Sequence, residues 1–246
     1  MTRFDIGEVL RPVTRRPLRR LPTPRPGCAT LPLRDDGGNA PRANGPLRER
    51  TAMSDQPTPD PIINRLRDVT IGGIEHREIV IAEYDPAWPQ RFAAEAERIS
   101  TALGDRARHV EHVGSTAVPG LAAKPIIDIL LVVDDPADED AYVPALQDAG
   151  YALRIREPDF HEHRMLRTAG RDVHLHVFGP GSPEVDRLVL LRDTLRADPS
   201  QRRRYEQTKR DLAARTWPTM QHYADAKSGI IEQILQRAGW SPTDPA

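Results

Sequence analysis

Short apolar runs separated by turn residues predict β-strands between residues 77 and 178. The expected strands are residues 77–84, 108–113, 126–133, 151–155, 163–168 and 172–178. The segment REIVIAEY (77–84) alternates apolar and polar positions, as a half-buried strand does. By contrast, IIDILLVV (126–133) is apolar at almost every position, which is typical of a central strand covered on both faces. We therefore expect a sheet with residues 126–133 in its interior.

Apolar positions spaced three or four residues apart predict helices in the rest of the chain. Asp85 and Pro86 form a start signal for a helix whose apolar face includes Trp88, Phe92 and Leu103. Further helices are expected at residues 138–150, 183–195, 200–215 and 220–238. Strands with interspersed helices, followed by helices alone, indicate an α+β fold with a mixed sheet, flanking helices and a helical C-terminal part.

The first 61 residues differ in composition from the rest of the chain. They contain 11 of the 24 prolines, and residues 1–52 contain 11 arginines, no lysine and five acidic residues. Such a segment buries too little apolar surface to offset the entropy of ordering it. We interpret residues 1–61 as a disordered leader, or as sequence upstream of a translation start at Met53; a basic arm for nucleic acid and a transit peptide are the alternatives. Residues 62–240 are expected to form the domain and residues 241–246 a tail.

The net charge of −1 hides an acidic domain, because residues 53–246 carry 24 basic and 31 acidic side chains. This balance argues against nucleic acid or an anionic membrane as a partner of the domain. Cys28 is the only cysteine, which excludes an internal disulfide and a cysteine-based zinc site. No apolar run reaches the length of about 18 residues that a membrane span needs, so we expect a cytoplasmic protein.

The most informative segment is HVGSTAVPGLAAKPIIDILLVV (112–133), in which a Gly-Ser turn precedes a strand that contains Asp128. A carboxylate among aliphatic residues is costly to bury unless a cation, a metal or hydrogen bonds compensate its charge. Asp128 therefore has either a structural partner or a role in a site. Gly114 and Ser115 suit close approach of a phosphate, since backbone N–H groups and a hydroxyl can face an anion there. Lys124 could neutralise the charge of that phosphate.

Several segments resemble the GrpB family: YDPAWPQRFAAEAERI, EHVGSTAVPGLAAKPIIDILL, HLHVFGPGSPE, LRDTLR and YADAKSGIIEQIL. The resemblance covers roughly residues 78–240 and implies a nucleotidyltransferase-like fold. It also implies similarity to the C-terminal extension of some dephospho-CoA kinases. Association with proteins of that kind would fit the resemblance.

In the nucleotidyltransferase superfamily, a Gly-Ser or Gly-Gly turn is followed by a strand with two acids separated by one residue, and a neighbouring strand carries a third acid. The resemblance carries this pattern onto Gly114, Ser115 and Asp128. The second acid is absent from the sequence, because Ile126 and Leu130 stand two residues on either side of Asp128. Phosphoryl or nucleotidyl transfer with Mg²⁺ uses several oxygen ligands. A non-catalytic ligand-binding or regulatory module is therefore the alternative to a transferase.

Histidines provide a second set of candidate ligands near Asp128. His174 and His176 share one face of their strand, and they would meet Asp128, Glu111 and His112 if the three strands are neighbours. Imidazole together with carboxylate favours Zn²⁺ or Mn²⁺ over Mg²⁺. Asp128, His174 and His176 are thus candidates for catalysis as well as for metal binding. The alternative is that the two histidines form hydrogen bonds on a half-exposed strand face.

The remaining candidates concern phosphate binding. The full set is Gly114, Ser115, Thr116, Lys124, Arg192, Lys209 and Lys227. Lys209 and Lys227 fall on inward positions of the C-terminal helices and could reach a phosphate across a cleft with the sheet. Arg192 either faces the pocket or forms a buried pair with Asp193. The sequence thus predicts a nucleotide or phosphorylated small molecule as the ligand, bound with a divalent metal (Mg²⁺, Mn²⁺ or Zn²⁺).

Overall fold

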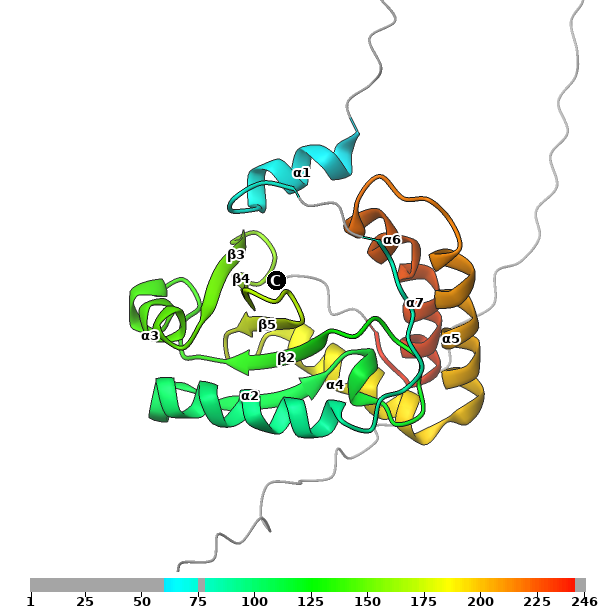
Figure 1. Cartoon of the computed structure of the whole chain (residues 1–246), viewed down its shortest axis with the longest axis horizontal. Coiled ribbons are helices and arrows are strands. Elements are labelled where there is room, and N and C mark those ends of the chain that lie inside the picture. Colours follow the sequence, from blue (N-terminus) through cyan, green and yellow to red (C-terminus); the bar gives the residue numbers. More distant parts are fainter. Residues whose placement is uncertain (1–59, 75–77, 242–246) are drawn as a thin grey trace, which may run out of the picture. The chain divides into compact units, whose positions relative to one another are not determined.

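Five strands form one mixed sheet in a computed structural model that describes residues 60–74 and 78–241. The order across the sheet is β1-β2-β5-β4-β3 (Figure 1). The strands are β1 (His109–Val113), β2 (Ile127–Val132), β3 (Tyr151–Glu157), β4 (His163–Thr168) and β5 (Val173–Phe178). β2 and β5 are parallel, and the other neighbours are antiparallel. The predicted α+β fold with a mixed sheet is confirmed.

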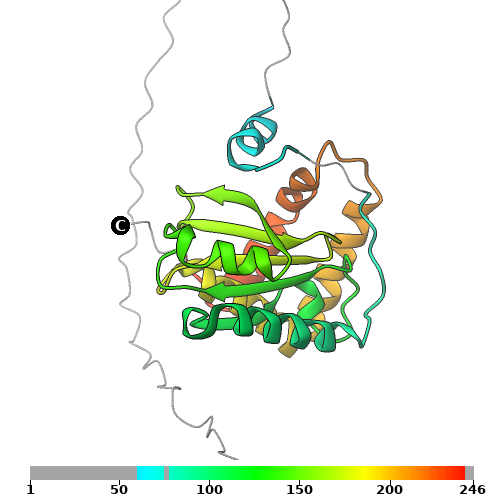
Figure 2. The same ribbon diagram turned by 60° about the vertical axis from the view of Figure 1, so that its left-hand side comes forward.

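The main apolar core lies between one face of the sheet and the helices α2 (Trp88–Leu103) and α3 (Val143–Asp148). Figure 2 shows α2 running along this face. Ile127, Ile129 and Leu131 of β2 are fully buried in the core, because alternate residues of a strand share a face. Asp128 lies between two of them in sequence and therefore points to the opposite face.

Part of that opposite face is covered by α4 (Pro183–Ala197), whose Leu188 packs against a cluster that includes Leu130 and Phe178. α5 (Pro199–Ala213) follows after one residue. Asp198 caps α5, because its carboxylate accepts hydrogen bonds from the first free backbone N–H groups of the helix. This capping residue and the proline after it explain why a new helix starts there and not a continuation of α4.

The C-terminal helices α5, α6 (Met220–Ala226) and α7 (Ser228–Arg237) lie side by side (Figure 1). A second apolar cluster joins them to α4 and to the segment between β1 and β2; it includes Val118, Leu121, Leu195, Tyr205 and Ile234. This cluster holds the helices beside the sheet, so that side chains of both can face a common space.

One described helix was not predicted: α1 (Pro61–Val69) begins at the end of the proline-rich leader. Asp60 caps it through backbone N–H groups of its first turn, and the other carboxylate oxygen lies 2.8 Å from Nε2 of His222 in α6. The N–H of Ile71 also donates to the carbonyl of Arg154 at 2.8 Å, which ties the following turn to β3. The rest of the leader, and all of the tail except Ser241, lie outside the described residues.

Two predicted elements are wrong. Residues 78–84 do not form a strand, because Ala82 alone pairs, with Ala123, through two backbone hydrogen bonds of 2.8 Å. The predicted helix 220–238 is two helices that meet at Lys227. Glycine and serine are poor helix formers, and Ser228 and Gly229 follow this break.

Short 3-10 turns complete the described elements, at residues Gly104–Arg106, Ser115–Ala117 and Glu139–Ala141. The last of these opens the segment 138–150, which was predicted as one helix and contains this turn and α3.

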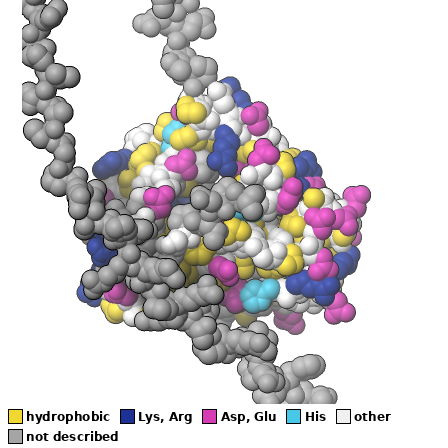
Figure 3. Space-filling view, turned by 180° about the vertical axis from the view of Figure 1, so that it is seen from behind, with side chains coloured by type: hydrophobic (Ala, Val, Ile, Leu, Met, Phe, Trp, Pro, Cys, Tyr) yellow, Lys and Arg dark blue, Asp and Glu magenta, His cyan; other side chains and the backbone are white. Residues whose placement is uncertain are grey.

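The surface is of mixed charge where Figure 3 shows it. Acidic and basic side chains are interspersed on the visible part of that face, in contrast to the single-sign patch typical of nucleic-acid binding. Among the described residues, no helix combines the length and the apolar character that crossing a membrane would require.

Candidate functional site

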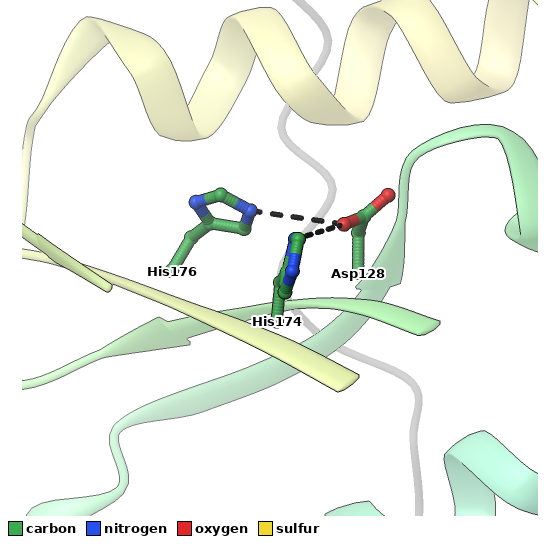
Figure 4. Close-up of side chains that lie close together, drawn as sticks. All are labelled: Asp128, His174 and His176. Carbon is green, nitrogen blue, oxygen red and sulfur yellow. Dashed lines mark ion pairs between the residues drawn. The ribbon is translucent and has the colours of Figure 1, made fainter. Parts of the chain in front are cut away.

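Asp128, His174 and His176 come together on the sheet face opposite the main core. Asp128 of β2 stands directly beside His174 of β5 in the parallel pairing, and His176 follows two residues later on the same face. Oδ1 of Asp128 lies 3.6 Å from Nδ1 of His174 and 3.8 Å from Nε2 of His176. Figure 4 shows the three side chains pointing toward one another. The geometry thus brings one carboxylate and two imidazoles to a single point.

The charge state of Asp128 follows from two opposing effects. Burial raises the pKa of the carboxyl group, but the contacts with His174 and His176 outweigh this effect and hold the pKa well below its usual value. Asp128 is therefore a carboxylate at neutral pH, and it carries a negative charge at the bottom of a partly buried site.

The three side chains fit a divalent cation by type and by spacing. Their candidate ligand atoms all lie within 4.8 Å of one another. Zn²⁺ binds imidazole nitrogen and carboxylate oxygen at about 2.0–2.2 Å, so small side-chain rotations would bring all three atoms onto one ion. Two imidazoles with one carboxylate favour Zn²⁺, Mn²⁺ or Fe²⁺ over Mg²⁺.

The Gly-Ser turn lies directly against Asp128. Gly114 has φ 70° and ψ −169°, a conformation that side chains disfavour. A Cβ at this position would lie 2.9 Å from Cβ and 3.0 Å from Cγ of Asp128, and closer still to Oδ2. Glycine is therefore required at this position for two reasons: the backbone conformation, and the space that the Asp128 side chain occupies. Ser115 begins the 3-10 turn that follows.

A cavity of about 420 Å³ joins the turn to the acid-histidine cluster. Its lining includes Gly114, Ser115, Asp128, His174, His176, Tyr223 and the cationic side chains Lys124, Arg154, Arg167, Arg171, Lys209 and Lys227. Among the described residues that line it, Asp128 is the only carboxylate. The cavity is therefore strongly basic, although the chain as a whole is nearly neutral.

Three lysines form one wall of this cavity together with two tyrosine rings. Nζ of Lys209 donates to the carbonyl of Ala122 at 2.6 Å and lies 4.9 Å from the centre of the Tyr205 ring. The amino groups of Lys227 and Lys124 lie 4.9 Å and 5.2 Å from the ring centre of Tyr223. The lysine side chains from β1–β2, α5 and the α6–α7 junction thus converge on one region.

Burial and mutual repulsion act on these lysines. Burial, followed by the charges of Lys227 and Lys124, lowers the pKa of Lys209 to about 7. Burial also lowers the pKa of Lys227, and the charge of Asp128 offsets this effect only in part. Burial and mutual repulsion therefore destabilise the protonated form of these lysines, and an anion bound between them would stabilise it.

Glu111 and Arg192 do not line the cavity. They form an ion pair with each other, and Arg192 also donates to the carbonyl of His112 at 3.0 Å and to Asp193 at 2.7 Å. Of the two alternatives for Arg192, the structure contains the pair with Asp193; the guanidinium is buried, but the Asp193 side chain is 50% exposed. Because its carboxylate is bound to this guanidinium, Glu111 is not part of the acid-histidine cluster.

His112 and Thr116 are also separate from the cluster. The His112 ring stacks on Phe92 of α2, with ring centres 4.7 Å apart, and its Nε2 lies 3.1 Å from Oγ1 of Thr116. The Thr116 hydroxyl donates to the carbonyl of Ile126 at 2.9 Å and is fully buried. His112 and Thr116 thus connect the turn to the core. The predicted residues that line the cavity are Gly114, Ser115, Lys124, Asp128, His174, His176, Lys209 and Lys227.

The sequence interpretation missed several residues that line the cavity. Arg167 of β4 pairs with His174 in the sheet and lies on the same face, so strand alternation could have identified it once the pairing was known. Arg154 and Arg171 come from β3 and from the turn before β5. Tyr223 is buried, and its hydroxyl has no hydrogen-bond partner among the described residues. No motif in the sequence marked these four positions.

The chain belongs to the GrpB family, because the family model described as GrpB protein matches residues 78–237. The predicted resemblance is thereby confirmed. A UPF0157 protein of Halalkalibacterium halodurans is 54% identical over 175 residues, which are 70% of this chain and 90% of that protein.

Two further relatives show the extent of the similarity. A crystal structure of GrpB from Enterococcus faecalis is similar with a TM-score of 0.58 and 30% identity, covering 65% of this chain and all of that one. A dephospho-CoA kinase of Mycolicibacterium paratuberculosis is 31% identical over 191 residues, which are 64% of this chain and 47% of that protein. The similarity to the kinase thus concerns about half of its length.

Proposed function

We propose that the chain binds a nucleotide or another phosphorylated small molecule in the basic cavity. The observation that carries this proposal is the convergence of Lys124, Lys209 and Lys227 beside the Gly-Ser turn, in the same cavity as Asp128. A phosphate between the three ammonium groups would offset their repulsion and accept hydrogen bonds from them. The backbone of the turn can approach a phosphate closely because Gly114 has no side chain.

The buried tyrosine supports the same ligand class. The hydroxyl of Tyr223 lacks a partner among the described residues, and the ring lies beside two of the lysines. Leaving a buried hydroxyl without a hydrogen bond costs about 1–3 kcal/mol. An oxygen atom of a bound ligand would satisfy it. The apolar side chains Ile155 and Met165 elsewhere in the lining would suit a base or another flat apolar group.

In this proposal, Asp128, His174 and His176 hold a divalent cation next to the phosphate. When bound, such a cation supplies Lewis acidity toward a phosphoryl oxygen. The lysines neutralise the remaining phosphate charge, and the Gly-Ser turn fixes the position of the group. Phosphoryl or nucleotidyl transfer is the reaction that this arrangement would serve.

A non-catalytic ligand-binding or regulatory module is the second candidate, and one observation favours it. Leu130, two residues beyond Asp128 on the same face, is completely buried in the cluster under α4 and provides no ligand atom. The site therefore offers one carboxylate where metal-dependent transfer commonly uses several. A module of this kind could act on a dephospho-CoA kinase-type partner, since such kinases contain a region similar to this chain.

A ligand panel tests the proposal. Thermal unfolding of the full chain is measured with nucleotides, coenzyme A precursors and inorganic phosphate, each with and without Zn²⁺, Mn²⁺ or Mg²⁺. Phosphorylated ligands should raise the midpoint, and Asp128→Ala should abolish the part of the increase that depends on the metal. Lys227→Met should weaken the phosphate-dependent part. Asp134→Ala is the matched control, because this carboxylate is exposed and pairs with Arg108 away from the cavity.

The outcomes separate the two candidates. A midpoint shift accompanied by a new phosphorylated product, both lost in Asp128→Ala, supports the transferase. A shift without product supports the module. If no phosphorylated compound changes the midpoint, or if Asp134→Ala abolishes the shift as completely as Asp128→Ala, the cavity is not a phosphate site.

A further inference from the structure

A line of polar contacts leads away from the acid-histidine cluster across the sheet. Nδ1 of His176 lies 3.1 Å from Nε2 of His163 in β4, and Nδ1 of His163 lies 2.8 Å from Oε2 of Glu157 in β3. At the other end, Nε2 of His176 faces Asp128 at 3.8 Å. Four adjacent strands, β3, β4, β5 and β2, therefore place Glu157, His163, His176 and Asp128 in one connected row.

The chemistry of these groups fixes the position of each proton. A carboxylate only accepts hydrogen bonds, so Nδ1 of His163 must carry the hydrogen that it donates to Glu157. In a neutral His163 ring, Nε2 then carries a lone pair and accepts the N–H of His176 Nδ1. The second nitrogen of the His176 ring, Nε2, faces Asp128, and it is therefore the nitrogen that a cation beside this carboxylate would bind in place of a hydrogen.

The surroundings favour the neutral ring that this assignment requires. His163 is buried, and its ring stacks on Phe178 with centres 4.8 Å apart. Arg65 of α1 binds the other oxygen of Glu157 at 2.8 Å and keeps that group a carboxylate.

We propose that Glu157 and His163 are positioning residues, which hold His176 in the tautomer whose Nε2 can bind a divalent cation beside Asp128. This inference rests on the metal site of the proposed function and adds the residues that select the metal-binding nitrogen. Partners of this kind, one layer behind the ligands, fix ring orientation and tautomer at metal sites, and their loss typically weakens metal binding about 10–100-fold.

The tautomer can be measured without any metal. Long-range ¹H–¹⁵N correlation spectra of the full chain, recorded at neutral pH after chelation of metals, report which nitrogen of each histidine carries the hydrogen. We expect hydrogen on Nδ1 of both His163 and His176 and a lone pair on Nε2 of His163. In His163→Phe, which keeps the flat ring beside Phe178, His176 should lose this preference. His163→Gln, whose amide offers one acceptor and one donor, should restore it.

Zn²⁺ affinity, measured by competition with a chromophoric chelator, provides the second measurement. We expect a loss of about 10–100-fold in His163→Phe, with His163→Gln close to the unmodified chain. His109→Phe is the matched control, since His109 is an exposed histidine on the edge strand β1. Circular dichroism and thermal unfolding confirm that each variant is folded.

The results distinguish the inference from the proposed function. A lone pair on Nδ1 of His176 in the metal-free chain, or hydrogen on Nε2 of His163, overturns the inference whatever the affinity for Zn²⁺. Equal Zn²⁺ affinity in His163→Phe and His109→Phe overturns it as well. If the expected tautomer is observed but the unmodified chain binds no divalent cation, the metal site is wrong and the role of Glu157 and His163 in orienting the ring is retained.

Discussion

Replacing Gly114 by alanine should damage both the stability of the fold and the position of Asp128. The backbone conformation at Gly114 is one that non-glycine residues adopt at a cost of about 1–3 kcal/mol. The added Cβ would also press against Cβ, Cγ and Oδ2 of Asp128, and overpacking of this kind costs about 1–3 kcal/mol. We therefore expect Gly114→Ala to lower the free energy of unfolding by about 2–6 kcal/mol. Urea denaturation followed by circular dichroism measures this change.

Gly120 provides the control for the backbone contribution. It also has positive φ, 74°, but a Cβ there would meet nothing within 4 Å. Gly120→Ala should therefore cost about 1–2 kcal/mol, from conformation alone. In an Asp128→Ala background, Gly114→Ala should cost less than in the original chain, because Cγ and Oδ2 are gone. A cost at Gly114 equal to that at Gly120, unchanged when Asp128 is truncated, would refute the close contact.

Two further predictions concern the segment that supports the turn. Arg192→Leu removes the buried cation that pairs with Glu111 and should lower the free energy of unfolding by about 3 kcal/mol. The double variant, Arg192→Leu with Glu111→Leu, should recover part of this loss. No recovery in the double variant would contradict the pairing. Burial lowers the pKa of His112 from 6.5 to about 4, so the unfolded chain takes up a proton before the folded chain does. The free energy of unfolding should therefore fall by about 3 kcal/mol as the pH decreases from 6.5 to 4, and urea titrations of His112→Gln should show a smaller fall over the same range.

Much of the sheet was predictable because its strands are short apolar runs separated by turn residues. The aliphatic run around Asp128 identified a buried strand with a single acid, and alternation placed His174 and His176 on a common face. The same alternation shows why Glu111 and His112 could not both join the cluster: adjacent residues of a strand point to opposite faces. One of them binds Arg192 and the other stacks on Phe92.

The partners that cross between strands could not be predicted. β2 and β5 are parallel neighbours although two strands separate them in sequence, and local patterns carry no information on such pairing. Without it, neither the approach of His163 to His176 nor the position of Arg167 beside His174 follows from the sequence. The segment 78–84 shows the reverse case: it has the alternating pattern of a strand, yet its only β-bridge joins Ala82 to Ala123.

The cavity is lined by two parts of the chain, one inside and one outside the span that matches the family model. The acid, the imidazoles and the lysines all lie within the span shared with the family, residues 78–237, whereas Leu66, Thr70 and Ile74 line the cavity from upstream of it. The helix α1 and the turn after it, held by contacts of Asp60, Arg65 and the backbone of Ile71, thus supply part of the cavity lining from outside that span. Substitutions in this segment would consequently alter the lining of the cavity while leaving Asp128, His174, His176 and the lysines unchanged.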